Sequence, residues 1–95
     1  MAERADVLVP SPKSPLGSAA AIAALDRQIQ ADHRRGDLAA LARDYAAGGD
    51  LYARTGRIDA ACFYWTQAWI LALDAGDASL EAETHAHLAR FGRID

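Results

Sequence analysis

Cysteine, proline and long apolar runs are scarce in this sequence, and each shortage excludes something. Cys62 is the one cysteine among 95 residues, so the chain forms no internal disulfide. All three prolines lie before Leu16, which leaves the rest of the chain free of proline as a helix breaker. No apolar run approaches the roughly 20 residues that span a bilayer. The acidic N-terminus, Met1–Asp6, lacks the apolar stretch of a secretory signal, so we expect a cytoplasmic protein with no membrane partner.

Positive charge is also in short supply. The formal net charge is -3 at pH 7. A protein that binds nucleic acid usually presents a basic face to the phosphates, so nucleic acid is not an expected partner. The basic residues are arginine except for Lys13. This bias is typical of a GC-rich genome, although arginine also suits bidentate recognition of carboxylates.

Alanine is what the sequence has in abundance. Hydrophobic residues make up 52% of the chain, and many are alanine, the strongest helix former, which lets helices approach closely. This composition predicts an all-α fold of three to four antiparallel helices in one domain, which we place over residues 16–95. Residues 1–15 hold the prolines and lack helical periodicity, which predicts a flexible arm. Val7-Leu8-Val9-Pro10 is an apolar island within it, either a plain part of that arm or a docking strand.

Turn and cap residues divide the domain into four helices. The predicted helices run from Ser14-Pro15 or Ser18 to Gly36, from a cap at Asp37 to Gly56, from about Arg57 to Leu73, and from about Ala78 to Phe91. Gly48-Gly49 lies inside the second of them. The pair either breaks that helix, which then restarts at Asp50, or marks a place where another helix presses close.

The third predicted helix is apolar nearly all round, which indicates burial on all sides or against a partner. Trp65 is predicted to face the core, and the residues on its side are Ile58, Cys62, Trp69 and Leu73. The residues on other faces are Phe63, Tyr64, Ile70 and Leu71. A small domain cannot bury all of them, so we expect aromatic residues of this helix, Phe63, Tyr64 and Trp69, at a protein–protein surface. The alternative is that the first helix or the N-terminal arm covers these side chains.

No catalytic or cofactor motif accompanies this architecture. His85-Ala86-His87 places two imidazoles on different sides of a helix, and Glu81 with His85 supplies two ligands on one face where zinc needs at least three. Cys62 lies in an apolar run without a neighbouring base, which predicts a buried structural thiol. The sequence holds no phosphate loop, paired-carboxylate signature or nucleophile elbow. We therefore expect no enzyme, no metal site and no cofactor.

An internal repeat is the clearest signal in the sequence. The segment Ala53-Arg54-Thr55-Gly56-Arg57-Ile58-Asp59 returns as Ala89-Arg90-Phe91-Gly92-Arg93-Ile94-Asp95, with six of seven positions identical at an offset of 36 residues. A period in this range is typical of stacked helix pairs. In each copy the glycine falls at a turn between helices, where a left-handed conformation is tolerated.

The surrounding residues make this repeat resemble the tetratricopeptide family. The matching positions, at that family's spacing, are Tyr45, Gly49, Tyr52, Gly56, Ala61, Trp65 and Ala68. The resemblance covers about 34 residues, roughly 42–75, and it implies a continuous helix through Gly48-Gly49. Three departures are visible: the period is two residues longer than usual, no proline closes the repeat, and the second copy ends after its first helix and turn.

In tetratricopeptide proteins the inner face of each repeat's first helix binds extended peptides. The positions that the resemblance assigns to this face are Arg43, Ala46, Asp50, Ala53 and Arg54, with Arg90 matching Arg54 in the second copy. Arg43 and Arg54 would then clamp a carboxylate or an acidic peptide. The alternative is a solvated helix face held by ion pairs such as Asp50–Arg54.

These patterns together predict a protein-interaction module or a small adaptor subunit that binds a protein partner. The main alternative is a small homo-oligomer in which the aromatic surface of the third helix mates with itself. A small-molecule or metal binder is less favoured.

Overall fold

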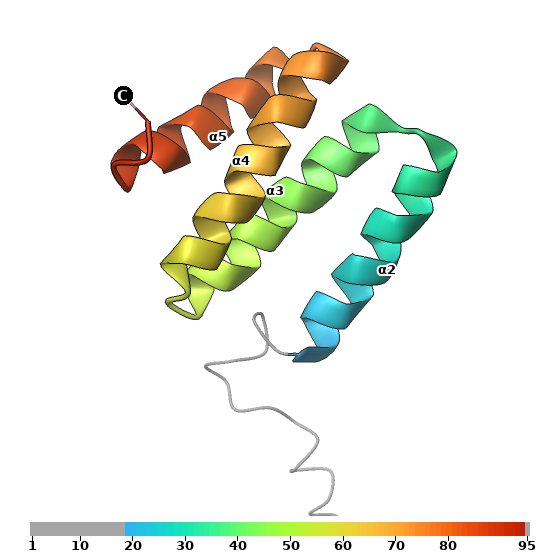
Figure 1. The fold of residues 1–95 in the computed structure, drawn as a ribbon, viewed down its shortest axis with the longest axis horizontal. Coiled ribbons are helices and arrows are strands. Elements are labelled where there is room, and N and C mark those ends of the chain that lie inside the picture. The colour runs from blue at the N-terminus through green and yellow to red at the C-terminus, as the bar shows by residue number, and fades with distance from the viewer. Residues whose placement is uncertain (1–18, 95) are drawn as a thin grey trace, which may run out of the picture.

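The computed structural model describes residues 19–94, and this part of the chain is all-α, as predicted, with no strand. Its helices, labelled as in Figure 1, are α2 (Ala19–Arg35), α3 (Leu38–Arg54), α4 (Ile58–Ala75) and α5 (Ala78–Arg90). The predicted arm over residues 1–15 and the predicted start signals Ser14, Pro15 and Ser18 lie outside the described residues.

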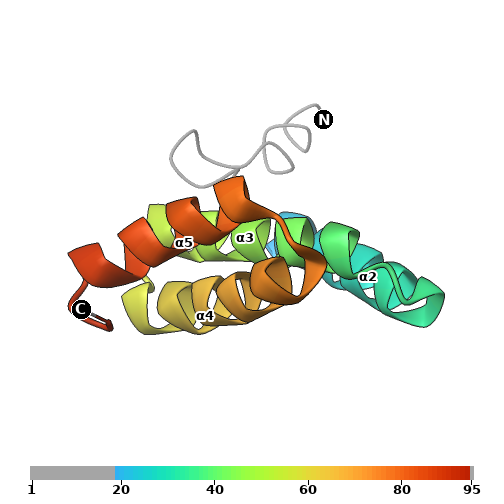
Figure 2. The ribbon, with the colours of Figure 1, turned by 90° about the horizontal axis from the view of Figure 1, so that it is seen from above.

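Consecutive helices run antiparallel, because each connection is only two or three residues long (Figure 1). The most extensive packing joins α3 to α4, while among the described helices the backbone of α2 approaches that of α3 alone. Helix α5 packs mainly on α4 and also touches α3. Figure 2 shows α3 and α5 on the same side of α4. This placement brings corresponding helices of the two repeat copies next to one another.

Glycine ends each helix by the same local mechanism. Gly36, Gly56, Gly76 and Gly92 have φ angles between 69° and 80°, a left-handed conformation that glycine adopts without steric cost. The residue after each glycine donates its backbone N–H to a carbonyl in the last turn, as Arg57 does to Tyr52 at 3.0 Å. The predicted cap is confirmed as well, since the Oδ1 atom of Asp37 accepts from the backbone N–H of Ala40 at 3.0 Å.

Helix α3 continues through Gly48-Gly49, so the predicted alternative of a break at this pair is wrong. Both glycines are buried. A Cβ atom built on Gly48 would overlap the ring of Tyr64, with Cε2 at 2.9 Å, and one built on Gly49 would overlap the ring of Trp65, with Cγ at 2.7 Å. The helix therefore retains two poor helix formers because only hydrogen fits under the aromatic residues of α4.

The core lies where α3, α4 and α5 meet. Its fully buried members are Ala61, Cys62, Trp65 and Leu88, which confirms the predicted burial of Cys62 and Trp65. The prediction for Leu73 is wrong, because its side chain is 48% exposed. Each step of four residues along a helix rotates the side chain by about 40°. Two such steps turn Leu73 away from the side that Trp65 presents to the core.

The two copies of the repeat motif share their turn geometry and also touch. Arg93 donates to the backbone carbonyl of Leu88 at 2.9 Å, just as Arg57 does to that of Tyr52 in the first copy. The Nη2 atom of Arg93 in turn lies 2.7 Å from the Oδ1 atom of Asp59. An ion pair thus links the end of the second copy to the end of the first.

Candidate functional site

An open groove of about 330 Å³ lies between α3 and α5. Its lining residues are Asp50, Ala53, Arg54, Trp65, His87, Arg90 and Phe91. Four of these, Asp50, Ala53, Arg54 and Arg90, belong to the inner face that the resemblance to tetratricopeptide repeats predicted. They meet because α3 and α5 lie side by side over α4 (Figure 2).

Trp65 forms the floor of this groove and is held from three sides. Its ring is only 2% exposed, and its Nε1 atom donates to the Oδ1 atom of Asp50 at 3.2 Å. The imidazole of His87 stacks on the indole at 4.3 Å between ring centroids, with 15° between the planes. Gly49 lies against the indole from α3. The floor is therefore rigid, which is the property that a preformed binding site needs.

His87 and Arg90 form a second polar cluster on the α5 side. The Nη2 atom of Arg90 lies 2.9 Å from the Nδ1 atom of His87. Because a guanidinium can only donate, Nδ1 accepts, and the proton of the neutral ring is placed on Nε2. That nitrogen lies 4.0 Å from the Oδ1 atom of Asp50 and 3.9 Å from the Oε2 atom of Glu83. Sequence reasoning missed His87 as a groove residue; its spacing of three residues from Arg90 on one helix is the signal that was available.

Arg54 is the exposed cation of the α3 side. It forms no ion pair with any residue between 19 and 94, so the Asp50–Arg54 pair named for the alternative of a solvated helix face is not made. Arg90 likewise has no carboxylate partner there, because its contacts are with His87 and with the ring of Phe91. Two guanidinium groups therefore border the groove, and no acidic side chain from residues 19–94 is bound to either.

The remaining predicted binding residues lie elsewhere. Arg43 is exposed on α3 but is not among the lining residues of the groove. Phe63 is 58% exposed on the outer side of α4. Tyr64 packs between α4 and α3, with its ring 5.1 Å from that of Tyr52. Trp69 is half-buried, and its ring lies 5.9 Å from that of His85 on α5, with 61° between the planes. The rings of Phe63 and Tyr64 lie 5.7 Å apart and contact each other, whereas Trp69 contacts α5.

A carboxyl pair lies between α2 and α3, and no motif or spacing in the sequence indicated it. Asp32 is 1% exposed, with its Oδ2 atom 3.1 Å from the Nε2 donor of Gln28 and its Oδ1 atom 2.9 Å from Nη2 of Arg35. Burial, and then a hydrogen bond with Asp32, raises the pKa of Asp44 to about 6. Hydrogen bonds from Asp44 and Gln28 lower the pKa of Asp32. Below about pH 6 the protonated carboxyl of Asp44 can therefore donate a hydrogen bond to the carboxylate of Asp32.

Within residues 19–94, no three His, Cys, Asp or Glu side chains gather where they could hold a metal ion. None of the described helices combines the length and the apolar character that crossing a bilayer requires.

Comparisons with known proteins give no relative. No protein-family model matches the chain, and no curated protein or solved structure was found to match it.

Proposed function

We propose that this protein is an interaction module that binds an extended, carboxylate-bearing segment of a protein partner in the groove between α3 and α5. The observation that carries the proposal is the pair of guanidinium groups, Arg54 and Arg90, that border a rigid aromatic floor without carboxylate partners among the described residues. Guanidinium groups bind carboxylates through two parallel hydrogen bonds. A bound acidic side chain or chain terminus would complete an ion pair that residues 19–94 leave open.

We further propose that the chain is built on the tetratricopeptide plan, with α3 and α4 as one repeat and α5 as the first helix of a second. The packing of Gly49 under Trp65 supports this proposal. So do Ala61 and Ala68, both 0% exposed, which allow α4 its close approach to its neighbours. In that family the inner face binds peptides, and here the corresponding face holds Asp50, Arg54 and Arg90. A role in binding rather than catalysis, in the cytoplasm, follows as part of the same proposal.

Fluorescence anisotropy with a labelled acidic peptide tests the groove. A fluorescein-labelled peptide with four glutamates is expected to bind the protein more tightly than the same peptide with four glutamines. Arg54→Glu is expected to weaken binding roughly tenfold or more, because a hydrogen bond to a charged group contributes about 1.5–3 kcal/mol and each 1.4 kcal/mol is about tenfold in Kd. Arg90→Glu is expected to weaken it by a similar factor.

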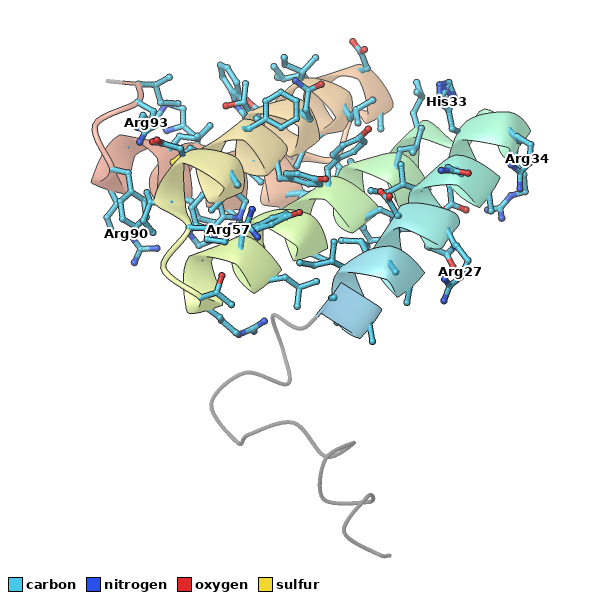
Figure 3. The ribbon with its side chains drawn as sticks, turned by 60° about the horizontal axis from the view of Figure 1, so that its bottom comes forward. Arg27, His33, Arg34, Arg57, Arg90 and Arg93 are labelled. Atoms are coloured by element: carbon cyan, nitrogen blue, oxygen red, sulfur yellow. The ribbon has the colours of Figure 1, made fainter. Side chains whose placement is uncertain are left out.

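Arg27→Glu is the matched control, since it reverses the same charge on α2, at the far end of the molecule from Arg90 (Figure 3). Equal losses in Arg27→Glu and Arg54→Glu would mean that net charge alone attracts the peptide, and the groove would be the wrong site. Light scattering addresses the alternative of self-association. A stable dimer whose groove rejects the peptide would favour the homo-oligomer over the interaction module.

A further inference from the structure

A second hollow, separate from the groove, opens beside the turn between α2 and α3. It measures about 350 Å³, and its lining residues are His33, Gly36, Leu38, Leu41, Tyr45, Gln67, Ile70 and Leu71. It shares no residue with the groove between α3 and α5. Leu38 and Ile70, on facing helices, are 42% and 46% exposed. Clustered exposed aliphatic side chains around a concavity are typical of a docking site.

The size of the hollow restricts what can fill it. A cavity of about 150 Å³ holds a group the size of benzene, so this one accommodates roughly two aliphatic side chains of an extended segment. A stable interface between two folded copies needs about 1,200 Å² or more of buried surface. The hollow is too local for that, and the exposed ring of Phe63 lies outside it.

The chain carries a segment of matching chemistry. Residues 1–18 lie outside the described residues, and their longest apolar run is Val7-Leu8-Val9. The residues between this run and Ala19 are the nine from Pro10 to Ser18, and they include all three prolines. Proline favours the extended polyproline conformation, in which nine residues span about 28 Å. The connection is thus long and polar, with the apolar side chains at its far end.

The reach of that connection agrees with the position of the hollow. From Ala19 to His33, which lines the hollow, α2 rises by about 21 Å. A segment that folds back along α2 therefore brings Val7-Leu8-Val9 level with His33, at the edge of the hollow. A tether of this length also holds the segment at an effective concentration of about millimolar, which a separate peptide would have to match in solution.

We propose that Val7-Leu8-Val9 docks into the hollow between Leu38 and Ile70 of the same chain and ties the N-terminal segment across α2. Docking would cover the exposed aliphatic side chains of α3 and α4. It would also hold α2, whose backbone approaches only α3, against the rest of the molecule.

Paramagnetic relaxation enhancement on the full chain tests this docking. A nitroxide is attached at Ser11→Cys, next to the apolar run, while Cys62, only 3% exposed, stays unlabelled. Amide signals of residues 38–41 and 67–71 are expected to lose most of their intensity, and those of residues 50–54 in the groove are expected to keep theirs. Ile70→Asp should restore the lost signals. Phe63→Asp, on the same helix but outside the hollow, should not.

Three outcomes would overturn the proposal. The first is attenuation that spreads evenly over the surface, and the second is attenuation that survives Ile70→Asp. The third comes from mixing labelled, unenriched protein with unlabelled, ¹⁵N-enriched protein. If residues 38–41 and 67–71 are attenuated in that mixture as strongly as within one chain, a second copy fills the hollow instead.

Discussion

Gly49→Ala is expected to lower the melting temperature by about 10 °C. A methyl group at this position overlaps the ring of Trp65, whose Cγ atom would lie 2.7 Å away and whose Cδ1 and Nε1 atoms would lie closer still. The ring cannot move aside easily, because Asp50 accepts a hydrogen bond from it and His87 stacks on it. Overpacking of this kind costs about 1–3 kcal/mol and sometimes more.

Alanine also improves helix propensity, which works in the opposite direction. Replacing glycine by alanine inside a helix stabilises it by about 1 kcal/mol. The overlap places the steric cost at or above the upper end of its range, so a net loss of about 2 kcal/mol remains. For a domain of this size each 1 kcal/mol shifts the melting temperature by about 4–8 °C. Circular dichroism at 222 nm during thermal unfolding measures the shift.

Ala47→Gly is the control for the propensity contribution, because Ala47 is exposed on the same helix. It is expected to destabilise by about 1 kcal/mol. Gly48→Ala provides a graded comparison, since Tyr64 is only partly buried and its ring has more freedom to shift. If Gly49→Ala proved as stable as the natural chain, Trp65 would not pack on α3 as described.

Asp44→Asn is expected to stabilise the protein at pH 8 and to remove a loss of stability that the natural chain shows above pH 6. The folded pKa of Asp44 is raised from 3.8 to about 6. A group with a raised folded pKa contributes stability that is fully present below its unfolded pKa and is lost as pH rises through its folded pKa. The carboxyl pair therefore loses its shared proton between about pH 5 and 7, and two carboxylates then repel each other between α2 and α3.

Asp32 behaves in the opposite sense, because its folded pKa is lowered. The stability that Asp32 contributes is fully present above its unfolded pKa of 3.8, and it is lost as the pH falls through the lowered pKa of the folded protein. The pair consequently stabilises the contact of α2 with α3 most between about pH 4 and 6. An asparagine at position 44 keeps a hydrogen-bond donor toward Asp32 at every pH and carries no charge.

The expected gain of Asp44→Asn at pH 8 is about 1–2 kcal/mol. The displaced pKa corresponds to roughly 3 kcal/mol at 1.36 kcal/mol per pH unit, and solvent around the partly exposed carboxyl screens part of it. Urea unfolding between pH 5 and 8 measures the free energy. Asp26→Asn removes the same charge from the exposed side of α2 and is expected to leave the pH profile unchanged. A natural chain equally stable at pH 5 and pH 8 would refute the shared proton.

Much of the fold was predictable from the sequence because helix ends depend on neighbouring residues. Gly36, Gly56 and Gly92 end helices through hydrogen bonds that span at most five residues, and Asp37 caps α3 from three residues away. The repeated motif predicted that α3 and α5 end in the same kind of turn. Three of the predicted binding residues, Asp50, Arg54 and Arg90, line one groove. Such local signals are available before any tertiary contact forms.

Only the tertiary structure decided which side chains meet across helices. The sequence left open whether Gly48-Gly49 breaks α3, and the rings of Tyr64 and Trp65 pressing on that helix give the reason for the pair. Nothing in the spacing of Asp32 and Asp44 indicated a shared proton, because the two residues lie on different helices whose angle brings them together. The exposure of Leu73 was likewise not predictable from its spacing, because it depends on where the neighbouring helices lie. Helices are determined by neighbours in sequence, whereas the groove, the hollow and the carboxyl pair depend on how those helices pack.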